Sequence, residues 1–176
     1  MFRRILVATD GSDNSRKAVE LAMTLASNDD AEVVVVHVLL AGELDADLQR
    51  LGEVEFPKIS LRPNKIGSTK TTIAAEVLQP LGAASRRAAS YEIVRTLGEQ
   101  VLQHAEQVLK SGGVNRVRAR ILDGNAVEQI MHAIVEEHPD AVICGARGLS
   151  NFQTLLLGSV SNKVAHLCPV TCITVR

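Results

Sequence analysis

Aromatic residues are scarce in this chain of 176 residues, which contains no tryptophan, one tyrosine and three phenylalanines. Proteins that bind single-stranded nucleic acid usually stack the bases on aromatic side chains along a positively charged groove. The charges are nearly balanced, with 19 Lys and Arg against 20 Asp and Glu and a formal net charge of −1. We therefore expect neither nucleic acid nor an anionic membrane surface among the partners.

Long hydrophobic runs are missing as well. The longest run, residues 33–41, has nine residues and includes His37, whereas a membrane-spanning helix needs about 20 residues. The three cysteines are an odd number, and the chain begins with a strand-like run rather than a signal peptide. We expect a cytoplasmic protein without a membrane segment.

Strand and helix patterns alternate along most of the chain, whose length suits a single α/β domain, residues 1–176. Short apolar runs predict strands at residues 5–9, 33–39, 117–121, 140–144 and 170–175. Apolar residues at helical spacing predict helices within residues 13–26, 94–108, 127–134 and 158–167. The alternation predicts a doubly wound, five-stranded parallel sheet.

Residues 42–90 break this pattern. They contain three of the five prolines and four glycines, and five acidic residues precede four basic ones: Glu43, Asp45, Asp47, Glu53 and Glu55, then Lys58, Arg62, Lys65 and Lys70. We interpret the segment as an insertion into the single domain. It is either a solvated excursion or a segment that covers a pocket or binds a partner.

A glycine-rich motif follows the fourth predicted strand. Gly145, Gly148 and Gly158 have the spacing G-x2-G-x9-G, and Ser159 comes next. The first two glycines allow close approach of the backbone to a ligand. Gly158 opens a helix whose free amide groups favour phosphate, and Ser159 and Ser161 add hydroxyl groups there. Because no Walker lysine motif occurs, the glycine-rich motif predicts an anion site that is built on backbone amides. The alternative interpretation is a flexible loop before a capped helix.

Asp10 ends the first predicted strand. In the strand orders 2-1-3-4-5 and 3-2-1-4-5 the first strand borders the switch point, where doubly wound sheets bind ligands. Asp10 and Gly145 would then face one crevice, and the carboxylate can accept a hydrogen bond from an adenine amino group or a ribose hydroxyl. The alternative is an aspartate that only caps the turn.

These residues together resemble the universal stress protein family. The resemblance is carried by residues 5–12, by His37-Val38, by residues 123–126, by the glycine motif with Val160-Ser161, and by residues 168–170. It covers residues 1–41 and about 91–176 and leaves the insertion unmatched. The glycine motif is similar to that of the family's ATP-binding branch, whereas Asn125-Ala126 replaces the more usual proline-containing turn.

The resemblance implies a Rossmann-like fold of the adenine nucleotide alpha hydrolase type, with strand order 3-2-1-4-5. It implies a cytoplasmic, ATP-binding stress regulator that is usually a homodimer. By position, the nucleotide-binding residues would be Ala8, Thr9, Asp10, Val38, Gly124, Cys144, Gly145, Arg147, Gly148, Gly158, Ser159, Val160 and Ser161. ATP, or AMP or ADP, would bind there, with Mg²⁺ or Mn²⁺ held by phosphate oxygens and water rather than by the protein.

No catalytic triad, carboxylate pair or general base is visible, so we expect at most slow ATP hydrolysis and assign no catalytic residue. The alternative function is an ATP pyrophosphatase-type or nucleotidyl-transfer enzyme of the same fold class. Residues 10–15 resemble the phosphate loop of such enzymes but lack its two adjacent glycines.

The remaining candidate residues are expected to be structural. His166, Cys168 and Cys172 lack a partner pair for a metal site, and a strand pattern intervenes. His37 is expected to be a satisfied buried histidine, and Cys144 a small buried strand residue. The apolar last strand, residues 170–175, would be a sheet edge through which two copies dimerise.

Overall fold

The computed structural model describes residues 2–39, 83–148 and 157–176. The described elements, in chain order, are β1 (Arg4–Ala8), α1 (Asp13–Asp29), β2 (Glu32–Leu39), α4 (Ala83–Ser111), β3 (Arg116–Asp123), α5 (Ala126–Glu137), β4 (Ala141–Gly145), α6 (Ser159–Leu167) and β5 (Thr171–Val175). Apart from the start of α4, these elements lie at the predicted places to within a few residues. Most of the predicted insertion, residues 42–82, falls outside the described residues.

The five strands form one parallel sheet in the order β3-β2-β1-β4-β5. This confirms the predicted order and places β1 at the centre. Ala8, the last residue of β1, pairs with Val36 of β2 and with Cys144 of β4. The carboxyl ends of these three strands therefore meet at one edge of the sheet.

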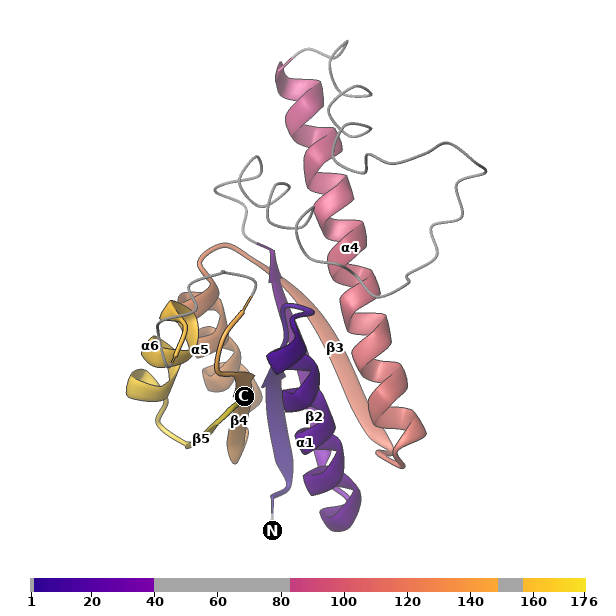
Figure 1. The fold of residues 1–176 in the computed structure, drawn as a ribbon, viewed down its shortest axis with the longest axis vertical. Coiled ribbons are helices and arrows are strands. Elements are labelled where there is room, and N and C mark those ends of the chain that lie inside the picture. The colour runs from indigo at the N-terminus through magenta and orange to yellow at the C-terminus, as the bar shows by residue number, and fades with distance from the viewer. Residues whose placement is uncertain (1, 40–82, 149–156) are drawn as a thin grey trace.

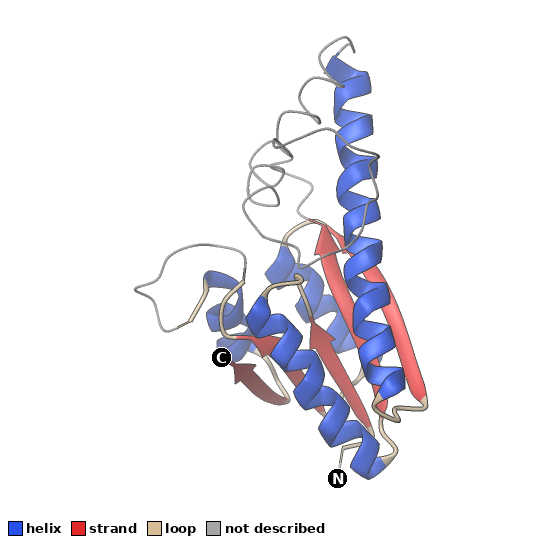
Figure 2. Ribbon diagram, turned by 45° about the vertical axis from the view of Figure 1, so that its right-hand side comes forward, coloured by secondary structure: helices blue, strands red, loops and turns tan. Residues whose placement is uncertain are grey.

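Helices cover both faces of the sheet (Figures 1 and 2). On one face, α1 and α4 pack on Val33 and Val35 of β2 and on their neighbours. On the other face, α5 and α6 pack on Val34 and Val36. Successive side chains of a strand point to opposite faces, so a continuous valine run suits a central strand that is buried on both.

Helix α4 begins earlier than the sequence suggested. The predicted insertion ends at about residue 90, but α4 already starts at Ala83. Residues 83–90 consist of Ala, Ser and Arg; they are compatible with a helix, yet they present no apolar stripe that would reveal one. The helix ends as predicted at Gly112-Gly113, where Gly113 has a φ of 89°.

Within residues 2–39, 83–148 and 157–176, no helix combines the length and the apolar character needed to cross a membrane.

Candidate functional site

Two loops face each other where β1 and β4 end. The chain passes from β1 into Thr9 and Asp10, and from β4, which ends at Gly145, into residues 146–148. The loops are so close that a Cβ atom at Gly148 would collide with Oδ2 of Asp10. The expectation that Asp10 lies across a crevice from the glycine motif is confirmed, and the lack of a side chain at Gly148 is what leaves room for the carboxylate.

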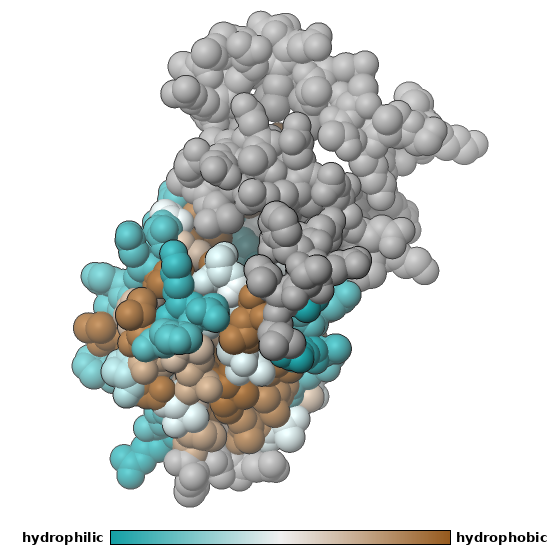
Figure 3. All heavy atoms as spheres, turned by 60° about the vertical axis from the view of Figure 1, so that its left-hand side comes forward, coloured by the Kyte–Doolittle hydropathy of each residue, from teal (hydrophilic) through white to brown (hydrophobic). Residues whose placement is uncertain are grey.

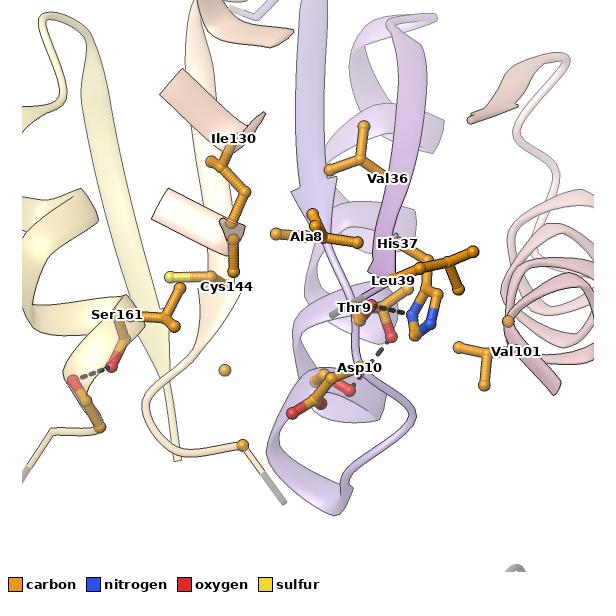
Figure 4. A pocket seen from close by; sticks show the side chains of 18 of the residues that line it. Ala8, Thr9, Asp10, Val36, His37, Leu39, Val101, Ile130, Cys144 and Ser161 are labelled. Carbon is orange, nitrogen blue, oxygen red and sulfur yellow. Dashed lines mark hydrogen bonds between the residues drawn. The ribbon is translucent and has the colours of Figure 1, made fainter. Parts of the chain in front are cut away.

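The crevice opens into a cavity of about 270 Å³ at the carboxyl edge of the sheet (Figure 4). The expected site residues that line it are Ala8, Thr9, Asp10, Val38, Cys144, Gly145, Arg147, Gly148, Gly158, Ser159, Val160 and Ser161. Gly124 does not line it: this residue turns the chain between β3 and α5 with a φ of 122°. The cavity wall thus combines strand ends, the glycine motif and one helix amino terminus.

One end of the cavity is polar. Gly158 is the N-cap of α6 and supplies no side-chain hydrogen bond to the first turn. Amide groups at the start of α6 therefore face this end without a side-chain cap, in the position that favours an anion. Arg147 is the cationic side chain among the described lining residues. The Ser161 hydroxyl was expected to be available to an anion. In the structure it donates to the carbonyl of Ala146 at 2.7 Å and so links the loop to α6.

Asp10 also has a local role. Its Oδ1 accepts a hydrogen bond from the amide of Ser12 at 3.0 Å. Ser12 in turn caps α1 and donates from its hydroxyl to the carbonyl of Arg147 at 3.3 Å. Asp10 therefore both shapes the turn and lines the cavity, and Ser12 ties this turn to the loop after β4.

The other end of the cavity is largely apolar. Its walls come from β2 and from the middle of α4, through Leu39, Val94, Leu97, Gly98 and Val101, with His37 among them. Val36 and Val38 line the cavity from the opposite face of β2, which is covered by α5 and α6. In the sequence, Val94, Leu97 and Val101 form one helical face that could equally be buried core. The α4 wall was therefore missed as part of the site, although its apolar stripe was visible.

His37 is half-buried and lines the cavity. Its Nδ1 lies 2.8 Å from the carbonyl oxygen of Thr9 (Figure 4). Burial lowers the pKa of His37, and this effect outweighs the opposing influence of the Thr9 carbonyl and of the Asp10 charge. The ring is therefore neutral at pH 7.

Cys144 is buried, as expected, and its thiol is free. The pKa of Cys144 is raised well above its ordinary value, first by a hydrogen bond with Cys172 and then by burial. A thiol in this state is a poor nucleophile, so Cys144 acts as a small apolar wall residue. Among the described residues, no group of three or more His, Cys, Asp or Glu side chains is arranged to hold a metal ion.

Comparison with solved structures identifies the fold. A universal stress protein from Lactobacillus plantarum superposes with a TM-score of 0.67 at 17% identity, covering 99% of this chain and 97% of that one. A universal stress protein in complex with cAMP gives a TM-score of 0.60 at 20% identity, covering 99% and 97%. One from Archaeoglobus fulgidus in complex with dAMP gives 0.57 at 16% identity, covering 99% and 98%.

Sequence comparison identifies the family. The family model described as "Universal stress protein family" matches residues 1–62 and 66–176. The match includes much of the segment that the resemblance left unmatched, so that part of the expectation was wrong. A Thermus aquaticus universal stress protein is 31% identical over 176 residues, with both chains fully covered. Bacillus subtilis universal stress protein YxiE is 28% identical over 172 residues, covering 97% of each chain. This chain belongs to the universal stress protein family.

Proposed function

We propose that this protein binds an adenine nucleotide, ATP or else ADP or AMP, in the cavity at the carboxyl edge of the sheet. One observation carries the proposal: a single cavity joins an uncapped helix amino terminus, an aliphatic wall and the Asp10 carboxylate. These three parts suit phosphate, base and ribose respectively. Two proteins of the same fold are in complex with adenine nucleotides, cAMP and dAMP.

Each part of the wall has a proposed role. The phosphates would lie against residues 145–148 and the first turn of α6, where Arg147 adds a positive charge. The nucleoside would lie against Ala8, Thr9, Asp10, Val38 and Cys144. Because Gly124 does not line the cavity, we leave it out of this set.

A divalent ion would enter with the nucleotide. Asp10 is the single carboxylate among the described lining residues, and Mg²⁺ commonly keeps several waters while it binds phosphate oxygens. Mg²⁺ or Mn²⁺ would therefore be held mainly by the triphosphate and water.

The biological role that we propose is a cytoplasmic, nucleotide-responsive stress regulator that hydrolyses ATP slowly at most. The titratable side chains near the nucleoside part of the wall are Asp10, bound to the Ser12 amide, neutral His37, held by the Thr9 carbonyl, and the protonated Cys144 thiol. Chromatographic analysis of ATP incubations tests this role. Rapid formation of AMP and pyrophosphate would instead favour the pyrophosphatase-type alternative.

Two substitutions test the binding site. Gly148→Val places a side chain where Asp10 lies, and Asp10→Ala removes the carboxylate. We expect each to weaken ATP binding at least tenfold in calorimetric titration. Asp13→Ala is the matched control, because this carboxylate starts α1 but its side chain is 82% exposed to solvent. Unchanged ATP affinity in both site variants would overturn the proposal. So would FMN as the nucleotide released on denaturation, or no nucleotide even after ATP has been supplied.

We also propose that two copies associate through the β5 edge. In the described sheet β5 pairs with β4 alone, and Leu167, which precedes it, is 59% exposed. The surface on this side of the molecule includes hydrophobic side chains (Figure 3). Such an edge is a template for pairing with a second strand. Sedimentation should give a dimer at micromolar concentration, and a monomer there would contradict this.

A further inference from the structure

The hydrogen-bond ladder between β1 and β2 ends where the cavity begins. Its last paired residues are Ala8 and Val36, and its last bond runs from the amide of Thr9 to the carbonyl of Val36 at 3.0 Å. In a parallel ladder, the next bond would run from the amide of Val38 to the carbonyl of Thr9. This bond is not formed, although both residues belong to the described part of the chain.

Val38 therefore directs its backbone groups to the cavity. Adjacent residues of a strand direct their N–H and C=O groups to opposite sides within the plane of the sheet. The carbonyl of Leu39 accepts from the amide of Gly124, just after β3, so the backbone groups of Val38 are directed to the other side, where β1 has ended. Val38 lines the cavity, and its amide donates to no other residue in the described ranges. This amide is a donor that a ligand can use.

The imidazole of His37 takes the place of the missing ladder bond. Its Nδ1 lies 2.8 Å from the carbonyl oxygen of Thr9, and a carbonyl oxygen can only accept, so Nδ1 carries the hydrogen. The ring lies on the face of the sheet that α1 and α4 cover, where a Cβ atom at Gly98 would lie 2.7 Å from its Cδ2. The Thr9 carbonyl is thus satisfied by a side chain, and the amide of Val38 is not needed for it.

We propose that His37 is a positioning residue for nucleotide binding: by holding the Thr9 carbonyl, it ends the β1–β2 ladder and keeps the Val38 amide available to an acceptor atom of the nucleoside. The proposal rests on the proposed function. Thr9 is buried, and a buried carbonyl without a donor costs free energy. Without the ring nitrogen, a shift that brings the Val38 amide onto the Thr9 carbonyl becomes favourable. The shift would remove the donor from the cavity.

Two substitutions of nearly identical shape isolate the donor. His37→Asn keeps a nitrogen that can donate to the Thr9 carbonyl, whereas the side chain of His37→Leu has almost the same outline and no donor. We expect His37→Leu to bind ATP about three- to tenfold more weakly than the wild type in calorimetric titration, the effect of one hydrogen bond. His37→Asn retains that bond and should stay within about twofold of the wild type.

Amide hydrogen exchange, followed by NMR, distinguishes positioning from a purely structural role. In the nucleotide-free wild type and in His37→Asn, the Val38 amide should exchange rapidly, and ATP should protect it. In nucleotide-free His37→Leu the same amide should exchange slowly, because the Thr9 carbonyl accepts from it. A mere loss of stability would speed up exchange instead, so protection at this amide is specific for the proposed shift.

Three results would overturn the inference and leave the proposed function intact. They are wild-type ATP affinity in folded His37→Leu, faster exchange of the Val38 amide in that variant, and slow exchange of this amide in the nucleotide-free wild type. The last measurement needs no variant and decides the question even where His37→Leu does not fold, which thermal unfolding verifies. Absence of ATP binding by the wild type would overturn both the inference and the proposed function.

Discussion

Gly145 and Gly158 belong to the same motif, but their surroundings differ. A Cβ atom at Gly145 would lie 2.8 Å from the amide nitrogen of Ser15 and 2.9 Å from the carbonyl carbon of Asn14. Both atoms belong to the backbone of α1, which cannot yield as a flexible side chain can. At Gly158 the nearest atoms would be 3.6 Å away, an ordinary contact distance. Gly145 therefore sets how closely α1 approaches the end of β4.

This difference predicts losses of stability of different size for two alanine substitutions. Gly145→Ala should lower the free energy of unfolding by about 1–3 kcal/mol, the usual cost of overpacking. Gly158→Ala should cost less than about 1 kcal/mol, which reflects only its N-cap position. Urea unfolding of both variants tests this. Equal losses would show that the contacts with α1 do not matter.

The start of helix α5 depends on the side chain of one residue, Asn125. Asn125 is the N-cap, and its Oδ1 accepts hydrogen bonds from the amides of Val127 at 3.0 Å and Glu128 at 3.3 Å. These bonds satisfy two of the amide groups that a helix start leaves without partners. Asn125 does not line the cavity, so its contribution to stability can be measured apart from binding.

Asn125→Ala should therefore lower the free energy of unfolding by about 1 kcal/mol and leave nucleotide affinity unchanged. Asn125→Asp is the matched control, because a carboxylate caps as well and suits the positive end of the helix dipole. Denaturant unfolding combined with nucleotide titration tests both statements. A stability of Asn125→Ala equal to that of the wild type would show that the cap is dispensable.

The elements were predictable because their signals are local. The valine run of β2 is apolar on both faces, and Gly112-Gly113 ends α4 where the helical pattern stops. The beginning of α4 was not predictable, since residues 83–90 carry no apolar periodicity. In the site, the glycine spacing and Asp10 indicated the polar end. The part of the wall formed by α4 could not be predicted, because the sequence does not show whether an apolar helix face meets the core or a cavity. The place of Gly124 outside the cavity could not be predicted either, because it depends on the direction of the turn after β3.

For the whole molecule, the two edges of the sheet differ in charge. The β3 edge carries Arg118 and Arg120, whose guanidinium groups lie 2.5 and 2.7 Å from the carboxylate of Glu137 in α5. Arg118 also contacts Glu32 of β2 at 2.6 Å. Charged side chains hinder strand pairing at an edge. This asymmetry favours the apolar β5 edge over β3 as the place where a second copy would associate.

The same ion-pair network makes stability depend on pH. Burial by itself raises the pKa of Glu137, but hydrogen bonds from Arg118 and Arg120 outweigh it and bring this pKa below its ordinary value of 4.5. A hydrogen bond from Arg118 is the main reason why the pKa of Glu32 is also lowered. As pH falls below 4.5, the unfolded chain takes up protons before the folded protein does. The contribution of these pairs is therefore complete above pH 4.5 and is lost as pH falls toward the lower pKa of the folded state.

Glu137→Gln tests this dependence, because it removes the charge and nearly preserves the shape. At pH 7 we expect the variant to be about 1.5–3 kcal/mol less stable than the wild type, the range for hydrogen bonds to charged groups. The difference should shrink as pH falls, because the wild-type carboxyl group then becomes neutral too. Glu99→Gln is the control: Glu99 pairs with Arg95 on the exposed surface of α4, so its loss should cost at most about 0.5 kcal/mol. Urea unfolding between pH 7 and pH 3 measures both variants. A Glu137→Gln difference that stayed constant over this range would mean that packing, rather than charge, is what Glu137 contributes.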